Sequence, residues 1–332
     1  MLSGLFYLSP HSHHLWNTLR QGSLLARNEV PTTKDPHPDF LKAGKIAGRV
    51  LHEIAPLVQS GEKVLKVCVL AERKIVEYGA HPAFPCNVSI NNEAAHYSSP
   101  YRDTRVFPDR GLVKVDLGAN VNGHLSDTAK TIDLDGSYEK FIIAAESALE
   151  AALATIQPGI RLGEVGAAIE KTIKREGLTP VHQLSGHQLK PNTLHAGKNV
   201  PNVKTMSIEK MQVGETFAVE PFATDGSGRI KAAKEAYIFS NDIRNRIKLD
   251  RMATQVRDLA RRKFGAVPWA SRWLYDLKND FDFEIPLKML TRAAVIHPYP
   301  VLLEADDGMV SQAEHSLFVS EKGAIVTTRY EP

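Results

Sequence analysis

The chain has few cysteines, and this excludes two classes of protein. Only Cys68 and Cys86 occur among its 332 residues. Two cysteines cannot form the disulfide framework of a small secreted domain, and they cannot supply a zinc site made of thiolates. The sequence therefore favours a reducing compartment, and we expect a cytoplasmic protein.

Long apolar runs are also lacking. No stretch approaches the roughly 18 apolar residues that a helix needs to cross a bilayer. The first apolar run, residues 2–8, has no basic residue before it and no small-residue cleavage pattern after it, so it is a poor secretory signal. We expect no membrane partner.

The chain also lacks a large excess of charge of either sign. Lys and Arg number 41 and Asp and Glu 38, so the formal net charge is +3. Over this length, that excess is too small to make nucleic acid an expected partner. Hydrophobic residues make up 43% and charged residues 24%, which are ordinary globular values, so a packed core is predicted.

Regular structure is predicted to begin near residue 39. Residues 1–36 end in a stretch that contains Pro31 and Pro36, which disfavours a helix. We therefore expect residues 1–36 to be a poorly structured extension and residues 37–332 to form the folded part of the chain.

A short internal repeat organises the folded part. Residues 61–79 recur as residues 159–177, at a constant offset of 98. Matching pairs are Val67 with Val165, Glu72 with Glu170, and Ile75 with Ile173. Each copy follows an apolar helical segment and precedes a β-rich one, at residues 112–119 and 216–222. Two related units of helices and strands are predicted.

Two acids flank a predicted β-hairpin. Asp116 ends an alternating strand, Asp127 follows eleven residues later, and Gly118, Asn122 and Gly123 lie between them. If the hairpin sets the two carboxylates side by side, they must share a proton or hold a cation, because like charges repel. A solvated hairpin with an acid at each end remains the alternative.

Three further polar residues adjoin apolar, strand-like segments. His187 lies in a glycine-containing turn, Glu220 in an apolar strand, and Glu314 before another strand. A carboxylate in such a segment needs a partner, since burying an unpaired charge is costly. One imidazole and four carboxylates suit a pair of divalent transition-metal ions. Each residue alone could instead be salt-bridged or exposed.

With these motifs in order, the chain resembles the methionine aminopeptidases from about residue 39 to residue 332. The matching motifs are residues 84–97, the hairpin from Asp116 to Asp127, residues 185–187 with 194–198, residues 217–222, and Glu314-His315. The family has the pita-bread (creatinase/aminopeptidase) fold. The resemblance thus implies an α+β protein of two pseudo-symmetric halves, with a curved antiparallel sheet and flanking helices.

The resemblance also implies roles for individual residues. The metal ligands of two divalent ions would be Asp116, Asp127, His187, Glu220 and Glu314. Among them, Asp127 and Glu314 would bridge the ions. Catalysis would be metal-dependent hydrolysis by a bridging hydroxide, with Glu220 moving a proton. His96 and His195 match two histidines that contact the scissile peptide and stabilise the tetrahedral intermediate.

The interval between Glu220 and Glu314 resembles the helical insertion of type 2 enzymes. Helices are predicted at residues 242–264, 269–280 and 286–295, and the insertion would span about residues 242–300. The short extension before residue 39 lacks the charged blocks of eukaryotic type 2 enzymes, so the chain looks like the archaeal form.

The resemblance implies removal of the initiator methionine from nascent proteins and peptides with a small second residue. Phe84, Cys86 and Phe222 match family positions near the methionine pocket, where Phe84 and Phe222 would bind substrate, and Leu194 adds branched aliphatic bulk. Some type 2 relatives carry a pocket histidine near residues 236–238, and this chain has none there. The metal is left open among Co, Mn, Fe and Zn. We expect a monomer, and contact with the ribosome is left open.

Two other functions remain in view. An X-Pro aminopeptidase of the same fold would share the metal ligands. A non-peptidase homologue that binds nucleic acid or protein would use the basic residues of the insertion, such as Arg244, Arg251 and Arg262. We expect those side chains to form a solvated helix face, because they are spread around the helix and do not form one stripe.

Overall fold

The structure, a computed structural model, describes residues 34–278 and 281–332. Most of the predicted extension, residues 1–33, lies outside the described residues, as do residues 279–280. The first described helix is α1 (Pro38–Ile54), with a proline in its first turn and the His37 side chain accepting a hydrogen bond from the Asp39 N–H. Within the described residues, regular structure begins at Pro38, next to the predicted residue 39.

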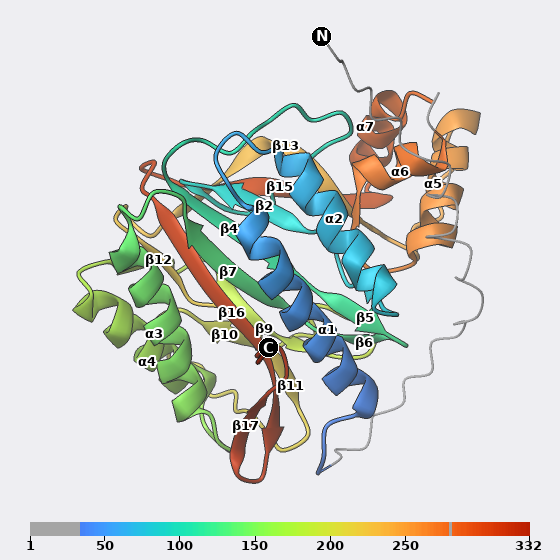
Figure 1. Ribbon diagram of the computed structural model, residues 1–332. Helices are drawn as coiled ribbons and strands as arrows, with labels where there is room; N and C mark the ends of the chain where they lie inside the picture. The colour runs from blue at the N-terminus through green and yellow to red at the C-terminus, as the bar shows by residue number, and fades with distance from the viewer. Residues whose placement is uncertain (1–33, 279–280) are drawn as a thin grey trace.

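A curved antiparallel sheet forms the centre of the molecule (Figure 1). Its strand order is β10-β9-β11-β16-β7-β4-β2. These strands are β2 (Asn87–Ile90), β4 (Leu112–Leu117), β7 (Thr128–Asp133), β9 (Ser185–Leu189), β10 (Asn199–Pro201), β11 (Thr216–Val219) and β16 (Val310–Ser320). Two more strands pair with β16, namely β12 (Phe222–Thr224) and β17 (Gly323–Val326), and β8 (Thr179–Pro180) joins the sheet by pairing with β12.

Two smaller sheets complete the strands. The first consists of β1 (His81–Pro82), β5 (Ala119–Val121) and β6 (His124–Leu125). The second has the order β14-β13-β15-β3, with β3 (Glu93–Ala95), β13 (Ile230–Asn241), β14 (Trp269–Ala270) and β15 (Ile296–Glu304). This second sheet connects the central sheet to the insertion.

Two helix pairs pack on the central sheet, one for each half. The first pair is α1 with α2 (Val64–Glu77), which share an apolar core with β2 and β4. The second is α3 (Glu139–Thr155) with α4 (Leu162–Arg175), which share a core with β11 and β16. A short 3-10 turn, Ala55–Leu57, follows α1. The predicted α+β class and pseudo-symmetric pita-bread arrangement are confirmed.

The helices reproduce the sequence repeat at both ends. α2 begins at Val64 and α4 at Leu162, and α2 ends at Glu77 and α4 at Arg175, so both bounds differ by 98. A glycine with positive φ precedes each helix, Gly61 at 77° and Gly159 at 86°. An L side chain rarely adopts that conformation, so glycine fixes the turn in both copies.

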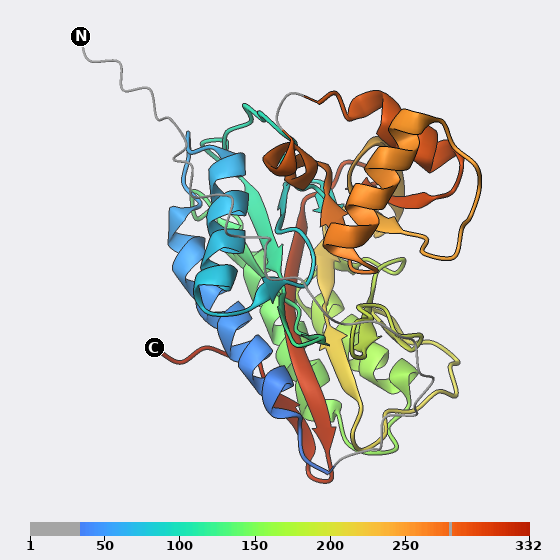
Figure 2. The same cartoon turned by 90° about the vertical axis from the view of Figure 1, so that its right-hand side faces the viewer.

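The insertion has its own apolar core. Its helices are α5 (Arg251–Phe264), α6 (Ser271–Leu277) and α7 (Glu284–Arg292), and their buried residues cluster around Trp269 and Trp273. Figure 2 shows α1 and α2 on one side of the central sheet and α5 and α7 on the other.

The first predicted helix of the insertion starts too early. Residues 242–250 are irregular, because the Asp242 carboxylate accepts hydrogen bonds from the N–H groups of Arg244 and Asn245 and so forms a local turn. The helix begins only after Asp250, whose side chain accepts from the Ala253 N–H as an N-cap.

A buried ion pair fastens the insertion to the first half. Arg272 of α6 donates to Glu72 of α2, and the side chains are 4% and 9% exposed. Trp273 donates from Nε1 to the same carboxylate at 2.9 Å, and the Cys86 N–H donates to it at 3.0 Å. Arg272 also donates to the Ser98 hydroxyl and the Ser99 carbonyl. Both oxygens of the carboxylate and both terminal nitrogens of the guanidinium thus have protein partners, whereas Arg272 Nε has none among the described residues.

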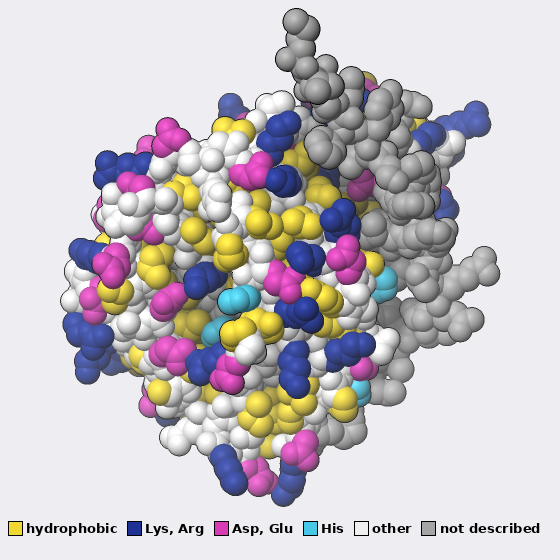
Figure 3. Space-filling view, in the orientation of Figure 1, with side chains coloured by type: hydrophobic (Ala, Val, Ile, Leu, Met, Phe, Trp, Pro, Cys, Tyr) yellow, Lys and Arg dark blue, Asp and Glu magenta, His cyan; other side chains and the backbone are white. Residues whose placement is uncertain are grey.

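The surface carries mixed charge. On the face seen in Figure 3, acidic and basic side chains of the described residues are interspersed among apolar ones. Among the described helices, none is both long and apolar enough to span a bilayer.

The Glu72–Arg272 pair predicts a large stability effect. Arg272→Met should lower the free energy of unfolding by about 3 to 5 kcal/mol, because Glu72 would be left buried without its countercharge. Glu72→Gln combined with Arg272→Met should recover part of that loss. Urea unfolding measures both.

The control is Arg329→Met, which removes an exposed pair with Glu150 whose side chains are 47% and 59% exposed. It should change stability little. If Arg272→Met were equally mild, the buried pair would not hold the insertion in place.

Candidate metal centre

Strand register brings the predicted ligands onto one face of the central sheet. Asp116 pairs with Ala129, and Glu314 pairs with the same Ala129 from the other side, so the two acids share a face. Asp127 lies two residues from Ala129 and therefore faces the same way. The acids of the first half thus meet Glu314 across three adjacent strands.

The second half supplies the remaining two residues by the same logic. His187 pairs with Ala218, and Glu220 lies two residues beyond Ala218, so His187 and Glu220 share a face. Val219 pairs with His315, which places Glu220 beside Glu314. The joining strand β16 therefore carries the acid at which the two halves converge.

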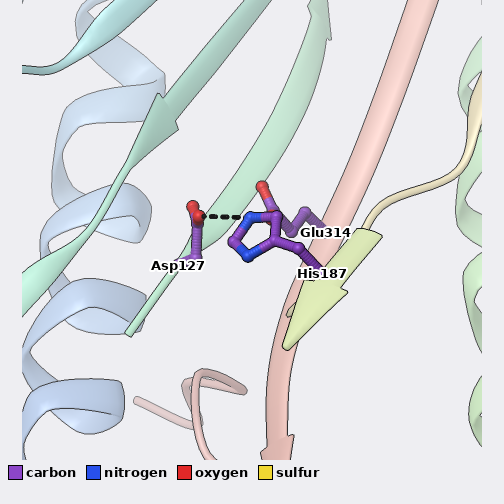
Figure 4. A group of neighbouring side chains, drawn as sticks. All are labelled: Asp127, His187 and Glu314. Carbon is purple, nitrogen blue, oxygen red and sulfur yellow. Dashed lines mark ion pairs between the residues drawn. The ribbon is translucent and has the colours of Figure 1, made fainter. Parts of the chain in front are cut away.

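Three of the five side chains form a tight group. Asp127, His187 and Glu314 each offer a ligand atom, and these atoms lie within 4.8 Å of one another (Figure 4). His187 Nε2 lies 3.4 Å from Asp127 Oδ2 and 3.9 Å from Glu220 Oε1. Asp116 and Glu220 lie outside the tight group but line the same cavity.

The group is buried and incompletely bonded. Asp127 is 5% exposed, His187 4% and Glu314 1%. Four of the buried ligand atoms have no hydrogen-bond partner among the described residues: Asp116 Oδ1, Asp127 Oδ1, His187 Nδ1 and Glu314 Oε1. Orphaned buried oxygens are costly, so this cluster suits an additional positive species.

The electrostatics lead to the same requirement. Burial, followed by the charges of neighbouring acids, raises the pKa of Asp116, Glu220 and Glu314 well above the usual range. Burial raises the pKa of Asp127 to about 7. Burial also lowers the pKa of His187 to about 4, so its ring is neutral and has a lone pair to offer. Each carboxyl must hold a proton or bind a cation.

The donor set fits divalent metal ions. Carboxylate oxygens with one imidazole nitrogen are the ligands that Mn, Fe, Co and Zn accept. Among the described residues, the only ion-pair partner of Asp127 and Glu220 is the neutral His187, and no Lys or Arg pairs with any of the four acids.

One cavity of about 230 Å³ collects the predicted catalytic and substrate-binding residues. Its lining includes His96, His195, Phe84, Phe222, Asp116, Asp127, His187 and Glu220. Glu314 lies in the tight group beneath it. Leu194 also lines the cavity, whereas Cys86 does not, because its backbone turns toward Glu72 and its side chain is fully buried. The sequence predicts Cys86 near the pocket, but its side chain does not line the cavity.

His96 is held in a defined orientation. Its backbone has φ of 69°, and its Nδ1 lies 3.2 Å from the Pro300 carbonyl oxygen. The Tyr299 ring packs edge-on against it with centroids 5.7 Å apart. Since a carbonyl only accepts, Nδ1 carries the hydrogen and Nε2 is left as an acceptor. Burial lowers the pKa of His96 to about 4, so the ring is neutral near pH 7.

His195 lies at the open side of the cavity. It belongs to the loop after β9, and it is exposed. Its ring centroid is 4.4 Å from that of His187. The two histidines thus approach the cavity from different sides, His96 from β3 and His195 from the second half.

Sequence reasoning missed three residues of this site. Asn87 pairs with Asp116 across β2 and β4 and lines the cavity. Gln312 donates from Nε2 to Glu220 Oε2 at 3.3 Å and to Glu314 Oε2 at 3.4 Å. Tyr299 lines the cavity from the insertion side. For Gln312 a signal exists, because it precedes Glu314 by two residues in a strand and must share its face.

The amino-acid sequence is similar to those of known metallopeptidases. The sequence model of metallopeptidase family M24 matches residues 39–252. A methionine aminopeptidase of Saccharolobus solfataricus is 38% identical over 298 residues, which cover 90% of this chain and 99% of that protein. A methionine aminopeptidase of Methanocaldococcus jannaschii is 39% identical over 290 residues, or 87% and 97% of the two chains.

Solved structures share the fold at lower identity. The methionine aminopeptidase of Thermotoga maritima aligns with a TM-score of 0.64 and 21% identity, covering 90% of this chain and 100% of that one. A thermophilic Arx1 aligns with a TM-score of 0.74 and 17% identity, covering 87% and 89%. At these identities the likeness concerns the fold alone.

The carboxylate cluster predicts a pH-dependent effect of metal removal. In the metal-free protein the pKa of Asp127 is about 7, above that of an unfolded carboxyl near about 3.9. A raised pKa means that the folded state holds a proton that the unfolded state lacks, so stability falls as pH rises through about 7. Bound cations keep the carboxylates ionised and remove this slope.

We therefore expect chelation to lower the melting temperature more at about pH 8 than at about pH 6.5. Calorimetry of metal-loaded and chelated protein at both values measures the difference. His96 and His187 are neutral in the folded protein across this window, so the titration of their unfolded imidazoles near about 6.5 affects loaded and chelated protein alike and cancels in the difference. An identical shift at both pH values would contradict the raised pKa of Asp127.

Proposed function

The chain belongs to metallopeptidase family M24 and, within it, to the methionine aminopeptidases, and from this premise we propose how its own residues perform the reaction. The activity is hydrolytic removal of an N-terminal methionine. The predicted family and activity are thereby confirmed, and the roles of single residues follow here as proposals.

The convergence of five side chains on one sheet face carries the proposal. We infer that Asp116, Asp127, His187, Glu220 and Glu314 would together hold two divalent ions there. Two divalent cations neutralise four carboxylates, and the orphaned oxygens support this count. When bound, the ions lower the pKa of a water molecule and polarise the substrate carbonyl. The metal is Mn, Fe, Co or Zn.

Glu220 is suited to move the proton. Its side chain is 15% exposed, more than that of Asp127, and it lines the cavity where a peptide bond would lie. Gln312 donates to its Oε2, which fixes the carboxylate orientation. Glu220 takes the proton of the attacking water and passes it to the amide nitrogen of the second residue as the C–N bond breaks.

The two histidines position the peptide bond. Because the Nε2 of His96 is an unprotonated acceptor, it can accept a hydrogen bond from the scissile N–H. His195, whose ring lies beside that of His187, has in its neutral form one ring N–H to donate to the carbonyl oxygen as negative charge develops there. The pair thus holds the nitrogen and the oxygen of one peptide bond.

The methionine side chain would contact an apolar wall. Phe84 and Phe222 are 5% and 1% exposed and line the cavity with Leu194. Thioether sulfur makes favourable contacts with aromatic rings, and the unbranched chain fits a narrow space. The substrates are then nascent polypeptides with a small second residue, processed in the cytoplasm by a monomer. This last part rests on the sequence resemblance alone.

The insertion completes the site. We propose that residues 37–332 form one catalytic domain in which the segment of about residues 242–300 is a helical subdomain of the type 2 enzymes. Its separate apolar core supports a subdomain, and the cavity-lining positions Pro268 and Tyr299 support its part in substrate binding.

A peptide assay tests the activity. Metal-reconstituted protein should release methionine from Met-Ala-Ser, and chelation should stop the release. Ala-Pro peptides are the control, because an X-Pro aminopeptidase would cleave these instead. Absence of metal-dependent methionine release would refute the proposed function.

A ligand variant tests the metal centre. Even outer partners of metal ligands affect metal affinity or activity by about 10 to 100-fold, so loss of a direct ligand in Asp116→Asn should reduce turnover by more than about 100-fold. The fold should persist, and elemental analysis should show reduced metal content. Asp306→Asn, whose carboxylate side chain is 56% exposed, is the control. Full activity in Asp116→Asn would mean that this carboxylate is not a ligand.

A further inference from the structure

Asn87 offers a buried hydrogen-bond acceptor that the reaction steps above leave unused. It begins β2, it is 6% exposed, and it lines the cavity. Its carboxamide oxygen Oδ1 is buried and has no hydrogen-bond partner among the described residues. A buried carboxamide without a partner is uncommon in a folded protein, so a missing donor is expected at this point.

The position of Asn87 indicates which part of a substrate could supply that donor. Asn87 lies directly across from Asp116 in the register of β2 and β4, and cross-strand partners have Cβ atoms about 4.5 to 5.5 Å apart. Phe84, three residues earlier, forms the apolar wall of the same cavity. Asn87 therefore lies between the wall for the methionine side chain and the carboxylate cluster.

The first residue of a peptide has three groups that diverge from its α-carbon. The apolar side chain faces Phe84, and the scissile carbonyl faces the carboxylate cluster. The remaining group is the free α-amino group, which carries only donors when protonated, as it largely is near neutral pH. A neutral oxygen beside the cluster is a suitable acceptor, because it stays available when the carboxylates bind cations.

The other amides and histidines of the cavity are less suitable. The Gln183 oxygen already accepts from the Ile230 N–H. Asn199 is exposed at the rim. His96 Nε2 is assigned to the scissile N–H. Within the described lining, Asn87 is the one carboxamide that is both nine-tenths buried and without a partner for its oxygen.

We propose that Asn87 Oδ1 accepts a hydrogen bond from the free α-amino group of the substrate and so helps to restrict cleavage to the first residue. This inference rests on the proposed function, since it assumes that the N-terminal methionine occupies the cavity. Asn87 then determines that an unmodified amino terminus is required, while Phe84 and Phe222 recognise the side chain.

A pair of ligands isolates this contact. L-methionine and 4-(methylthio)butanoate differ only in the amino group, so the ratio of their dissociation constants reports its recognition. Isothermal titration of the metal-loaded protein measures both constants without requiring turnover. In Asn87→Ala, L-methionine should bind about 10-fold more weakly, because a hydrogen bond to a charged group is lost, and the deaminated ligand should be unaffected.

Three further variants make the result decisive. Asn87→Leu has the same branched shape and no acceptor, and it should repeat the loss if Asn87→Ala does not fold. Asn87→Gln keeps a neutral carboxamide oxygen and should retain part of the preference for L-methionine. Asn199→Ala, at the rim of the cavity, should leave the ratio unchanged.

Equal weakening of both ligands in Asn87→Ala and Asn87→Leu, or loss of metal by elemental analysis, would overturn the proposal and assign Asn87 a structural or metal-binding role. An unchanged ratio would overturn it as well. Methionine release from Met-Ala-Ser distinguishes this failure from failure of the proposed function. If the wild-type protein cleaves that peptide and the ratio does not respond, only the role of Asn87 is wrong.

Discussion

The structure depends on a concentration of acidic groups that no Lys or Arg of the described residues pairs with. Four carboxylates face one another on the central sheet, and their nearest basic group is a neutral imidazole. Holding them together requires a rigid frame, and the antiparallel register provides it, since it fixes which side chains share a face. The helix pairs pack apolar cores that keep this frame in place. The cation requirement is therefore a property of the fold, set by three adjacent strands.

Much of the frame could be predicted from local patterns, and the limits of that prediction have a physical cause. The helices at Val64 and Leu162 begin 98 residues apart because glycine turns and apolar spacing are encoded locally in both copies. The acids could be singled out because charge in an apolar strand is costly wherever the strand lies. The grouping of Asp127, His187 and Glu314 needed the family resemblance, since nothing local relates residues so far apart.

Contacts between distant segments were out of reach. The Pro300 carbonyl that sets the orientation of His96 lies 204 residues further along the chain. Asn87 could be recognised as part of a motif, but its position opposite Asp116 depends on strand pairing. The start of α5 was misjudged because Asp242 forms a turn whose strength is invisible to helical periodicity. Expectations for residues 1–33 concern a part of the chain outside the described residues.

The repeat has diverged at one pair of positions. Glu72 in α2 is buried against Arg272, whereas its counterpart Glu170 in α4 pairs with Lys174 of its own helix and accepts from the Lys204 N–H. The insertion attaches at the first of these two related positions. The insertion therefore walls the cavity on one side, with Pro268 and Tyr299, while the exposed loop with His195 borders the other. The insertion makes the surroundings of the cavity unequal in the two related halves. The burial of Glu72, and not of its counterpart Glu170, therefore bears on the side from which a polypeptide reaches the cavity.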